Sequence, residues 1–402
     1  MTLIQLRRIA SVLNGGTPTI DELNWGGGVP WATPVDLAKV NGRSIERTDR
    51  TLTHAGLVSG STLAREESVL VSSRAPIGYT AIARVPMAFN QGCKAVVPVD
   101  GQCARFLQYC LVALTETMKA SGSGSTFLEL SSEALASMEI PDVTPGEQRR
   151  IADFLDDRVA RIDQIIATRR LQIDAFNKQR SHQLESVLRR IPDTTRASRV
   201  VRVLPGFAFP SADYTAYQGD RRLLRGINLT VGCTRWEDIV YWPESRVDEV
   251  VEFVLSPGDL VLGMDRPWVG DGLRIARVTE EDERPLLLQR VARISSAVLT
   301  NAFMFWAYQS QRFRDQVESD LTGLSVPHLS GEQIGSFEIP VCSLREQVQI
   351  VAAIDAGQQS VTTMIGALGR SIELLTEYKQ SLITAAVTGE LDVTTAGSGI
   401  PG

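Results

Sequence analysis

Several features that mark other protein classes are missing from this sequence. No run of 18 or more apolar residues occurs, and the first ten residues carry Gln5, Arg7 and Arg8 in place of the apolar core of a signal peptide. The five cysteines are odd in number and include no C-x-x-C pair, and only three histidines occur. These absences argue against a membrane span, a disulfide framework and structural zinc, and they favour a cytoplasmic protein.

The motifs of common catalytic sites are missing as well. There is no Gly-Lys pair for a phosphate-binding loop, no Pro-Pro pair for the Asn/Asp-Pro-Pro-aromatic motif of amino-methyltransferases, and no G-x-S-x-G elbow. A D/E-x-K nuclease motif occurs only at residues 377–379, inside a predicted helix, where we interpret it as solvated surface. His54, His182 and His328 have no partner at a ligand spacing, so we interpret them as surface or capping residues. We therefore predict no catalytic, cofactor-binding or metal-binding residues, and a protein that recognises rather than one that catalyses.

The composition is that of a folded protein with a mildly acidic balance. Hydrophobic residues make up 43% of the 402 residues and charged residues 22%, and this length suits two or three domains. Lys and Arg number 41 against 47 Asp and Glu, so the net charge of -6 argues mildly against a surface that follows a phosphate backbone throughout. Between residues 191 and 340 all 16 basic residues are Arg, which suits bidentate contacts to guanine or phosphate. Arg outnumbers Lys in the whole chain, however, as GC-rich coding would also produce, so Arg usage alone does not indicate nucleic acid binding.

An internal repeat organises the chain. The sequence SMEIP at residues 137–141 returns as SFEIP at residues 336–340, and a Glu-Gln pair returns in the same way, both at an offset of 199. Across 27 ungapped positions around these motifs 11 residues are identical, where unrelated segments would share about two. Upstream the match is looser: RAPIG starting at Arg74 resembles RPWVG starting at Arg266, and Gln91 falls near Gln289. The chain is therefore predicted to alternate a variable domain with a shared segment, twice.

Each shared segment predicts a long helix. Apolar residues with the spacing of a coiled-coil seam follow the second Glu-Gln pair: Ile354, Val361, Ile365, Leu368, Ile372, Leu375 and Leu382. Their counterparts after the first pair are Leu155, Val159, Ile162, Ile166, Ile173 and Phe176. Arg169 and Arg180 interrupt this first seam, while Glu147 and Glu346 suit a first helical turn. Two helices of roughly 40 residues, about 60 Å long, can therefore pack on each other. Seen alone, the same pattern would suit a generic coiled-coil spacer or a dimerisation rod.

The variable halves combine short strands with one apolar helix each. Residues 68–71, 95–98 and 259–262 are strand-like, and residues 106–114 and 302–308 suit core helices. We expect a mixed α/β fold in which two globular domains are joined by two long antiparallel coiled-coil-like helices, with an internal pseudo-two-fold repeat. The expected domains are a first recognition domain, a central spacer helix, a second recognition domain, a C-terminal spacer helix and a flexible tail: residues 1–144, 145–190, 191–343, 344–390 and 391–402.

This arrangement resembles the specificity subunit of type I restriction-modification systems. The resemblance covers nearly the whole chain, because each variable domain is followed by an Ile-Pro-x5-Glu-Gln helix. The segments that carry it are NGGTP at 14–18, the loop from Trp25 to Trp31, TFLELS at 126–131, LLRGIN at 223–228, YWP at 241–243, GDL at 258–260 and residues 378–389. Their order, doubled at an offset of 199, is the specific feature.

The resemblance implies a division of labour in which this chain has no activity alone. Each variable domain would read one half of a bipartite double-stranded DNA target, and the helix pair would set the unread gap. Two domains on one rod suit half-sites about one turn of B-DNA apart, about 34 Å. Two methyltransferase subunits carrying S-adenosylmethionine would methylate adenine at N6 after flipping it, and ATP- and Mg-dependent restriction subunits would translocate and cut. No cofactor is expected in this chain.

The residues expected to contact DNA lie in Gly-rich loops or follow strand ends. They are Thr17, Trp25, Trp31, Arg74, Lys94, Arg221, Arg222, Arg225, Asn228, Arg266 and Arg290. Trp25 and Trp31 suit core aromatics equally well. Arg74 and Arg266, each placed before a proline, suit the bracing of a turn as well as a phosphate contact.

Three other readings stay open at this point. The chain could be a scaffold whose heptad helices dimerise and whose flanking domains bind protein. It could serve a system in which nuclease and methyltransferase are fused. An enzyme would need an unrecognised active site. Adjacent methyltransferase and ATPase genes would support a specificity subunit with separate partner subunits, and one large fused neighbour would support the fused system. Lack of either would leave the scaffold.

Overall fold

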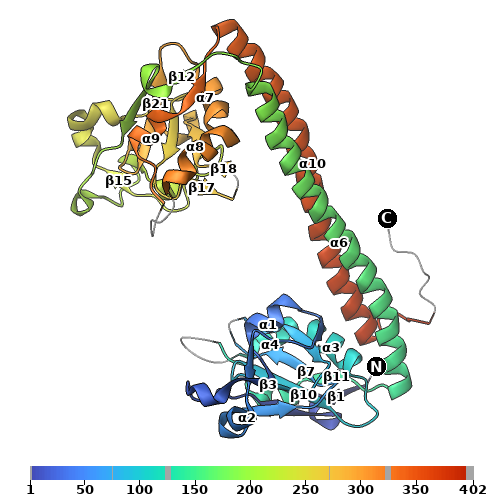
Figure 1. Cartoon of the computed structure of the whole chain (residues 1–402). Coiled ribbons are helices and arrows are strands. Elements are labelled where there is room, and N and C mark those ends of the chain that lie inside the picture. Colours follow the sequence, from blue (N-terminus) through green and yellow to red (C-terminus); the bar gives the residue numbers. More distant parts are fainter. Residues whose placement is uncertain (1, 75, 123–127, 271, 322–326, 395–402) are drawn as a thin grey trace. The chain divides into compact units, whose positions relative to one another are not determined.

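The chain forms two compact units with a mixed α/β fold (Figure 1). The computed structural model describes residues 2–74, 76–122, 128–270, 272–321 and 327–394. The first unit combines residues 1–170 with residues 369–402, and the second is residues 171–368. Two long helices, α6 (Pro145–Leu188) and α10 (Leu344–Thr388), contribute one stretch to each unit. Each unit is therefore a globular domain together with one segment of each long helix.

The first domain contains two stacked sheets with strand orders β2-β10-β7-β8-β4 and β5-β3-β9-β6. Their strands are β2 (Ala10–Asn14), β3 (Trp25–Ala32), β4 (Arg43–Ile45), β5 (Arg50–Leu52), β6 (Thr62–Ala64), β7 (Val69–Ser72), β8 (Thr80–Ala83), β9 (Met87–Phe89) and β10 (Cys93–Pro98). Helices α1 (Pro34–Lys39), α2 (His54–Gly60), α3 (Ala104–Ala113), α4 (Thr115–Ala120) and α5 (Ser132–Ser137) complete it. Because side chains alternate along a strand, Val69 and Val71 join the core beneath the helices and Leu70 joins the core between the sheets. The first sheet is thus buried on both faces.

The second domain repeats this central sheet. Strands β13 (Val201–Pro205), β21 (Val291–Ser296), β16 (Leu260–Gly263) and β19 (Ile275–Arg277) lie in that order and take the places of β2, β10, β7 and β8. The remaining elements are β14 (Arg221–Leu224), β15 (Tyr241–Trp242), β17 (Trp268–Val269), β18 (Gly272–Leu273), β20 (Leu286–Leu287), α7 (Asn301–Tyr308), α8 (Gln311–Leu321) and α9 (Gly331–Ser336). Leu260 and Leu262 face the core with the helices while Val261 faces the opposite core, which repeats the alternation of β7.

Each domain is tied to its long helices by a short strand pair. Strand β1 (Leu3–Gln5) pairs antiparallel with β11 (Glu139–Pro141), which directly precedes α6. In the same way β12 (Thr194–Arg196) pairs with β22 (Glu338–Pro340), which precedes α10. The repeated Glu-Ile-Pro motif is therefore the last strand of each domain and fixes where each long helix begins.

Both long helices begin with a reciprocal cap. The Glu147 carboxylate accepts hydrogen bonds from the Thr144 hydroxyl at 2.7 Å and its amide at 2.9 Å, and the Glu147 amide donates back to the hydroxyl at 3.3 Å. Ser343 and Glu346 form the same three bonds at the start of α10. Hydrogen bonds from the hydroxyl and then from the amide lower the pKa of both glutamates. The Glu of the repeated pair is thus a capping residue.

The Gln of the repeated pair anchors each helix to its domain. Gln148 and Gln347 are almost fully buried. The Gln148 side-chain oxygen accepts the amide of Cys103, the N-cap of α3, at 2.9 Å. The Gln347 oxygen accepts the amide of Thr300, the N-cap of α7, at 2.8 Å. A buried polar group must be hydrogen-bonded, so this glutamine fixes the long helix against the core helix in each domain.

A second repeated residue makes the same connection two turns later. Asp156 accepts hydrogen bonds from the Tyr109 hydroxyl at 2.7 Å and from Arg105, both on α3. Asp355, 199 positions on, accepts the indole N–H of Trp306 of α7 at 2.8 Å. The identities across the repeat therefore concentrate where a domain holds its helix.

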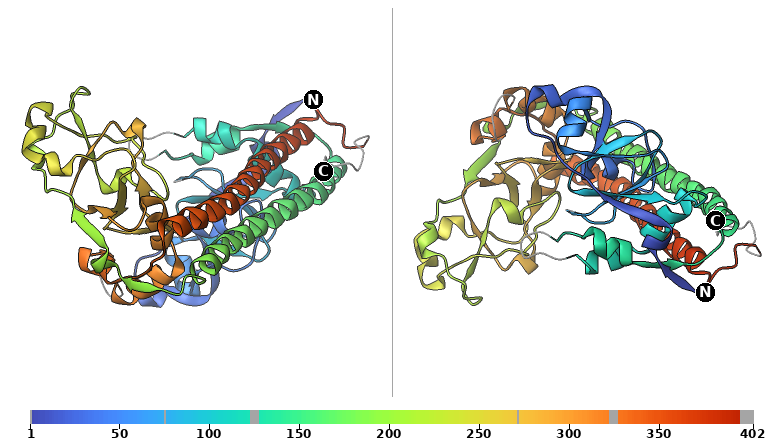
Figure 2. Two further views of the ribbon diagram at one scale, coloured as in Figure 1. Left: turned by 90° about the horizontal axis from the view of Figure 1, so that it is seen from above. Right: turned by 90° about the horizontal axis from the view of Figure 1, so that it is seen from below.

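Within each unit the stretches of α6 and α10 lie side by side and run antiparallel (Figure 1, Figure 2). In the first unit the Lys379 ammonium contacts the Asp163 carboxylate at 2.6 Å. In the second the Gln358 side-chain amide donates to the Arg180 carbonyl at 3.4 Å. The buried residues of the seam are Leu155, Ile162, Ile166, Ile354, Val361 and Leu382. This burial confirms the predicted heptad seam.

The predicted fold class is confirmed, including the strand-like segments and the two core helices. Three parts of the predictions lie outside the described residues: Ala75, Thr126 with Phe127, and residues 395–402 of the expected tail. Leu391 and Val393, which belong to that tail, pack partly buried against the first core. Across the described ranges no helix is long and apolar enough to cross a membrane.

Candidate DNA-binding surfaces

A first polar cluster, Arg74, Gln91 and Glu129, lies where β7 and β10 meet the segment before α5. The Arg74 guanidinium contacts the Glu129 carboxylate at 3.1 Å and reaches the Gln91 carbonyl at 3.5 Å. The Thr17 hydroxyl donates to the Gln91 side-chain oxygen. Thr17 and Gln91 are exposed, and the side chains of Arg74 and Glu129 are about two-fifths exposed. The cluster therefore presents hydrogen-bonding groups of both kinds at the surface.

Lys94 lies beneath this cluster. It is only 4% exposed, and its ammonium donates to the Asn14 side-chain oxygen at 2.9 Å. Burial lowers the pKa of Lys94, Glu129 counteracts that effect, and Arg74 adds to it. The geometry makes Lys94 a support for the cluster, since its charge has little access to a ligand.

The two tryptophans expected to contact DNA form an aromatic pair with ring centroids 5.0 Å apart. Trp31 is 4% exposed, and its indole N–H donates to the Gly16 carbonyl at 3.1 Å. Trp25 is half-buried, and the Arg50 guanidinium lies 3.6 Å from its ring centroid. Trp31 therefore has the position of a core aromatic. Trp25 keeps part of its surface exposed beside a cation, and its indole N–H donates to the Thr19 carbonyl at 3.0 Å.

A second polar cluster, Asp265, Arg290 and His328, occurs in the second domain. The Asp265 carboxylate contacts Arg290 at 2.7 Å and His328 Nδ1 at 2.6 Å. Burial raises the pKa of Asp265, but the hydrogen bond to His328 and the charge of Arg290 outweigh it and hold this pKa below its ordinary value. Arg266 and Arg290 adopt φ angles of 44° and 70°, a left-handed conformation that is rare for residues other than glycine.

The three arginines around β14 are all engaged within the second domain. Their ion pairs are Arg221–Glu244, Arg222–Glu283 and Arg225–Asp238. Their side chains are only about one-fifth exposed. Asn228 is almost fully buried and donates to two backbone carbonyls at 3.1 and 2.9 Å. These residues hold the loop after β14, and DNA would have to compete for the arginines with carboxylates already in place.

The two polar clusters occupy equivalent places in the repeat. The same two backbone hydrogen bonds join three segments in each domain: Ser73 N to Gly92 O and Leu130 N to Ser73 O, then Met264 N to Arg290 O and Leu329 N to Met264 O. The next residues form an isolated β-bridge in each, Arg74 with Glu129 and Asp265 with His328. The equivalent of Arg74 is therefore Asp265. The expected match of Arg74 with Arg266 was wrong by one position, because the loops after these residues differ in length.

Four of the clustered positions were not among the candidate contacts expected from the sequence: Gln91, Glu129, Asp265 and His328. One signal was present, because Pro76 and Pro267 lie two residues after Arg74 and Asp265, and alignment on these prolines brings the two residues together. Their partners Glu129 and His328 could not be recognised from the sequence in this way, because they come from distant parts of the chain.

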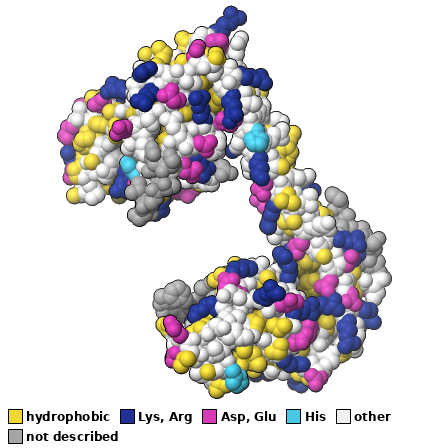
Figure 3. All heavy atoms as spheres, in the orientation of Figure 1, with side chains coloured by type: hydrophobic (Ala, Val, Ile, Leu, Met, Phe, Trp, Pro, Cys, Tyr) yellow, Lys and Arg dark blue, Asp and Glu magenta, His cyan; other side chains and the backbone are white. Residues whose placement is uncertain are grey.

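Charge is mixed over the molecular surface. On the face in view, basic and acidic side chains are interspersed and form no continuous basic stripe (Figure 3). Many of these arginines pair with carboxylates at the surface, as Arg202 does with Glu252 at 2.9 Å. No three His, Cys, Asp or Glu side chains gather as a metal site among the residues that the structure describes. The candidate sites are therefore local polar clusters.

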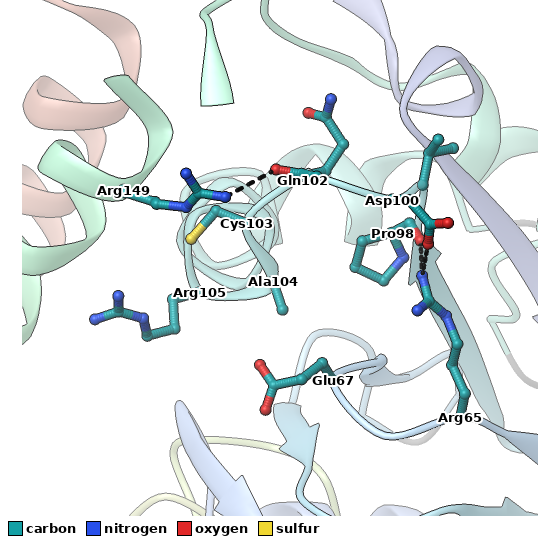
Figure 4. Close-up of a pocket in the computed structure, with 11 residues that line it drawn as sticks. Arg65, Glu67, Pro98, Asp100, Gln102, Cys103, Ala104, Arg105 and Arg149 are labelled. Carbon is teal, nitrogen blue, oxygen red and sulfur yellow. Dashed lines mark hydrogen bonds and ion pairs between the residues drawn. The ribbon is translucent and has the colours of Figure 1, made fainter. Parts of the chain in front are cut away.

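One polar cavity of about 290 Å³ opens between α3, the loop before it and the start of α6 (Figure 4). Arg149 spans it to the Gly101 carbonyl at 3.4 Å, and Arg65 contacts Asp100 at 3.5 Å. Arg105, which also lines the cavity, is engaged with Asp156 on α6. The cavity is thus part of the attachment of α6 to the first domain.

Comparison with known proteins identifies this architecture. Residues 1–175 match the family described as the type I restriction modification DNA specificity domain. Over 179 residues the chain is 36% identical to the MjaIX specificity subunit of a type I restriction enzyme from Methanocaldococcus jannaschii. The first 175 residues are therefore similar to this specificity domain. Over 162 residues the chain is also 32% identical to the EcoAI specificity subunit of a type I restriction enzyme from Escherichia coli.

These two matches each span a limited part of the proteins concerned. They cover 43% and 40% of this chain, but only 40% and 27% of the MjaIX and EcoAI specificity subunits. A longer match, 23% identical, to the MjaVIII specificity subunit of M. jannaschii covers 72% of this chain and 70% of that protein. A chain in a solved structure described as "Structural basis underlying complex assembly and conformational transition of the type I R-M system" has a TM-score of 0.74 at 15% identity. It covers 97% of this chain and 98% of that chain, which establishes the shared fold.

Proposed function

We propose that this chain is the DNA-recognition subunit of a type I restriction-modification complex. Each domain reads one half of a bipartite double-stranded target, and the two long helices set the gap and dock the methyltransferase subunits. The chain directs N6-adenine methylation and restriction without a catalytic role of its own.

The observation that carries this proposal is the duplicated attachment of two domains to one helix pair. In both halves a Glu caps the long helix, a buried Gln joins it to the core helix, and an Asp two turns later accepts a hydrogen bond from that core helix. These residues recur at an offset of 199. The exposed side chains differ between the halves at matched positions, as Arg74 and Asp265 do. A constant attachment with variable surfaces suits a protein that places two different readers on one duplex.

The length of the helices supports their role as a spacer. With 44 and 45 residues, α6 and α10 are each about 66 Å long at 1.5 Å per residue. Half-sites about one turn of B-DNA apart are separated by about 34 Å. Helices of this length can carry two readers and still leave surface for partner subunits.

The partners supply the chemistry in this proposal. Two methyltransferase subunits bind S-adenosylmethionine and flip the target adenine, and restriction subunits use ATP and Mg. The complex acts in the cytoplasm. The recognition domains are residues 1–144 and 191–343. A net charge of -6 is compatible with DNA binding because partner subunits can share the neutralisation of phosphates.

The residues that we propose at the DNA interface are those expected from the sequence, but their burial supports two different roles. Thr17, Arg74, Arg266 and Arg290 are the least buried of the proposed contacts, and Trp25 is half-buried. The remaining proposed residues are half-buried or buried and act mainly by holding the reading loops: Trp31, Lys94, Arg221, Arg222, Arg225 and Asn228.

The decisive experiment is single-molecule sequencing of the host genome for N6-methyladenine, with the gene intact and deleted. Loss of one split sequence motif on deletion is expected, and the motif would give both half-sites at once. Complementation with the intact gene should restore the same motif. An unchanged methylome in a host that expresses the chain with its methyltransferase partners would contradict the proposal.

A further inference from the structure

The two polar clusters share one backbone position but reverse the order of charge. In the first domain a cation, Arg74, follows strand β7 and faces the anion Glu129. In the second domain an anion, Asp265, takes the place of Arg74 and faces His328. The backbone hydrogen bonds around both clusters are the same, so the framework is retained while its chemistry is exchanged.

The residues next to the clusters are buried in the core, whereas the cluster side chains lie at the surface. Leu130 and Leu329, which follow Glu129 and His328 directly, are fully buried and equivalent. The cluster side chains stand at the surface, and Arg290 is 69% exposed although it contacts Asp265. An ion pair at such exposure contributes little to the stability of the fold. Stabilisation alone therefore does not explain why both domains have a polar cluster at this position.

Backbone conformation is also unusual at the second cluster. Arg266 and Arg290 both have positive φ; Arg266 lies three residues after the end of β16, and Arg290 directly precedes β21. Strained residues persist where the surrounding structure holds them, and they gather at functional sites. In the first domain the position of Arg290 is taken by Gly92.

A glutamine occurs at the same backbone position in both domains, within the first cluster and next in sequence to the second. Gln91 precedes Gly92 and Gln289 precedes Arg290, and both glutamines are exposed. A glutamine amide can bind both N6 and N7 of adenine, and an arginine can bind both O6 and N7 of guanine. In each domain an exposed glutamine therefore lies close in sequence to a guanidinium or within its cluster, and an acid holds that guanidinium in place.

From this arrangement we propose that the two clusters are the equivalent base-reading sites of the two domains, each reading purine edges in the major groove. Gln91 and Arg74 contact the first half-site, and Gln289 and Arg290 contact the second. Glu129, Asp265 and His328 orient the arginines as positioning residues. This inference rests on the proposed function, and it assigns the difference between the half-sites to the exchanged charges.

The test measures sequence preference one base pair at a time. The full-length chain, assembled with its methyltransferase subunits, is bound to DNA libraries in which each half-site position is randomised. Arg290→Ala should reduce preference about 5- to 150-fold at one base pair of the second half-site and leave the first unchanged. Arg290→Lys should lose the same preference, because it keeps the charge but not the bidentate geometry. Gln91→Ala should act in the same way on the first half-site only.

Arg202→Ala is the matched control, because Arg202 forms an exposed ion pair on the same domain outside the cluster. It should leave every base preference intact, and the melting temperature of each variant is measured alongside. Equal weakening of all sequences by Arg290→Ala, or a profile like that of Arg202→Ala, would overturn the assignment of the cluster. Absence of any split preference in the unsubstituted complex would instead overturn the proposed function itself, and this assignment with it.

Discussion

Replacing Gln347 by methionine is expected to destabilise the second unit strongly. The side chain is fully buried, accepts the Thr300 amide at 2.8 Å and donates to the Val298 and Cys342 carbonyls at 2.9 and 3.0 Å. Methionine has a similar length and no branching, so the change removes three hydrogen bonds without opening a large cavity. A buried group left without a partner costs about 1 to 3 kcal/mol, and the two carbonyls can partly recover by binding water. The expected loss in free energy of unfolding is therefore about 2 to 5 kcal/mol.

The assay must resolve the two units, because a chain with two cores need not unfold in one step. Urea unfolding, combined with hydrogen exchange at the amides of α7, would report the second unit, and α3 would report the first. For a unit of this size the change corresponds to a lowering of the melting temperature by about 4 °C or more. The equivalent substitution Gln148→Met should have its effect on α3 instead.

Gln359→Met provides the control, since Gln359 lies on the same helix and is exposed. It should change stability by less than about 0.5 kcal/mol. If Gln347→Met were no more destabilising than Gln359→Met, the buried glutamine would not be the anchor between α10 and α7, and the reasoning from the repeated hydrogen bonds would be refuted.

Three further predictions concern the helices and the β14 loop. The contact of Lys379 with Asp163 at 2.6 Å should give a coupling of about 0.2 to 1 kcal/mol in a double-mutant cycle at low salt, and no coupling there would contradict it. The capped Glu147 and Glu346 have lowered pKa values in the folded chain. Their contribution to the free energy of unfolding is therefore present above the unfolded pKa, near 4.5, and is lost as pH falls through the folded pKa. The difference in free energy of unfolding between the original chain and the double variant Glu147→Gln, Glu346→Gln should therefore vanish in acid. A difference that persists in acid would contradict this prediction. Because Arg222 pairs with Glu283 and holds the loop after β14, Arg222→Ala should weaken target binding and also lower the melting temperature; weaker binding with an unchanged melting temperature would indicate a direct DNA contact instead.

The local sequence determined the helices and the repeat. A seven-residue spacing of apolar residues such as Ile354, Val361 and Leu382 leaves a helix one apolar stripe, and a helix with one stripe needs a partner. The Glu-Ile-Pro and Glu-Gln motifs were informative because a strand end, a cap and a first turn each depend on a few neighbouring residues. For the same reason residues 68–71 and 259–262 were recognised as equivalent strands.

The roles of the polar side chains were decided only by the tertiary structure. Arg74 and Glu129 are 55 positions apart, and Asp265 and His328 are 63 apart, so no local pattern joins them. The burial of Trp31 likewise follows from its packing with Leu52 of β5, Ala88 of β9 and Leu57 of α2, which are distant from it in sequence. A heptad or a cap depends on residues within one or a few helical turns, whereas each polar cluster forms where distant segments meet. The sequence by itself therefore determined that two domains share one helix pair, and the packing of each domain decided which polar side chains remain exposed.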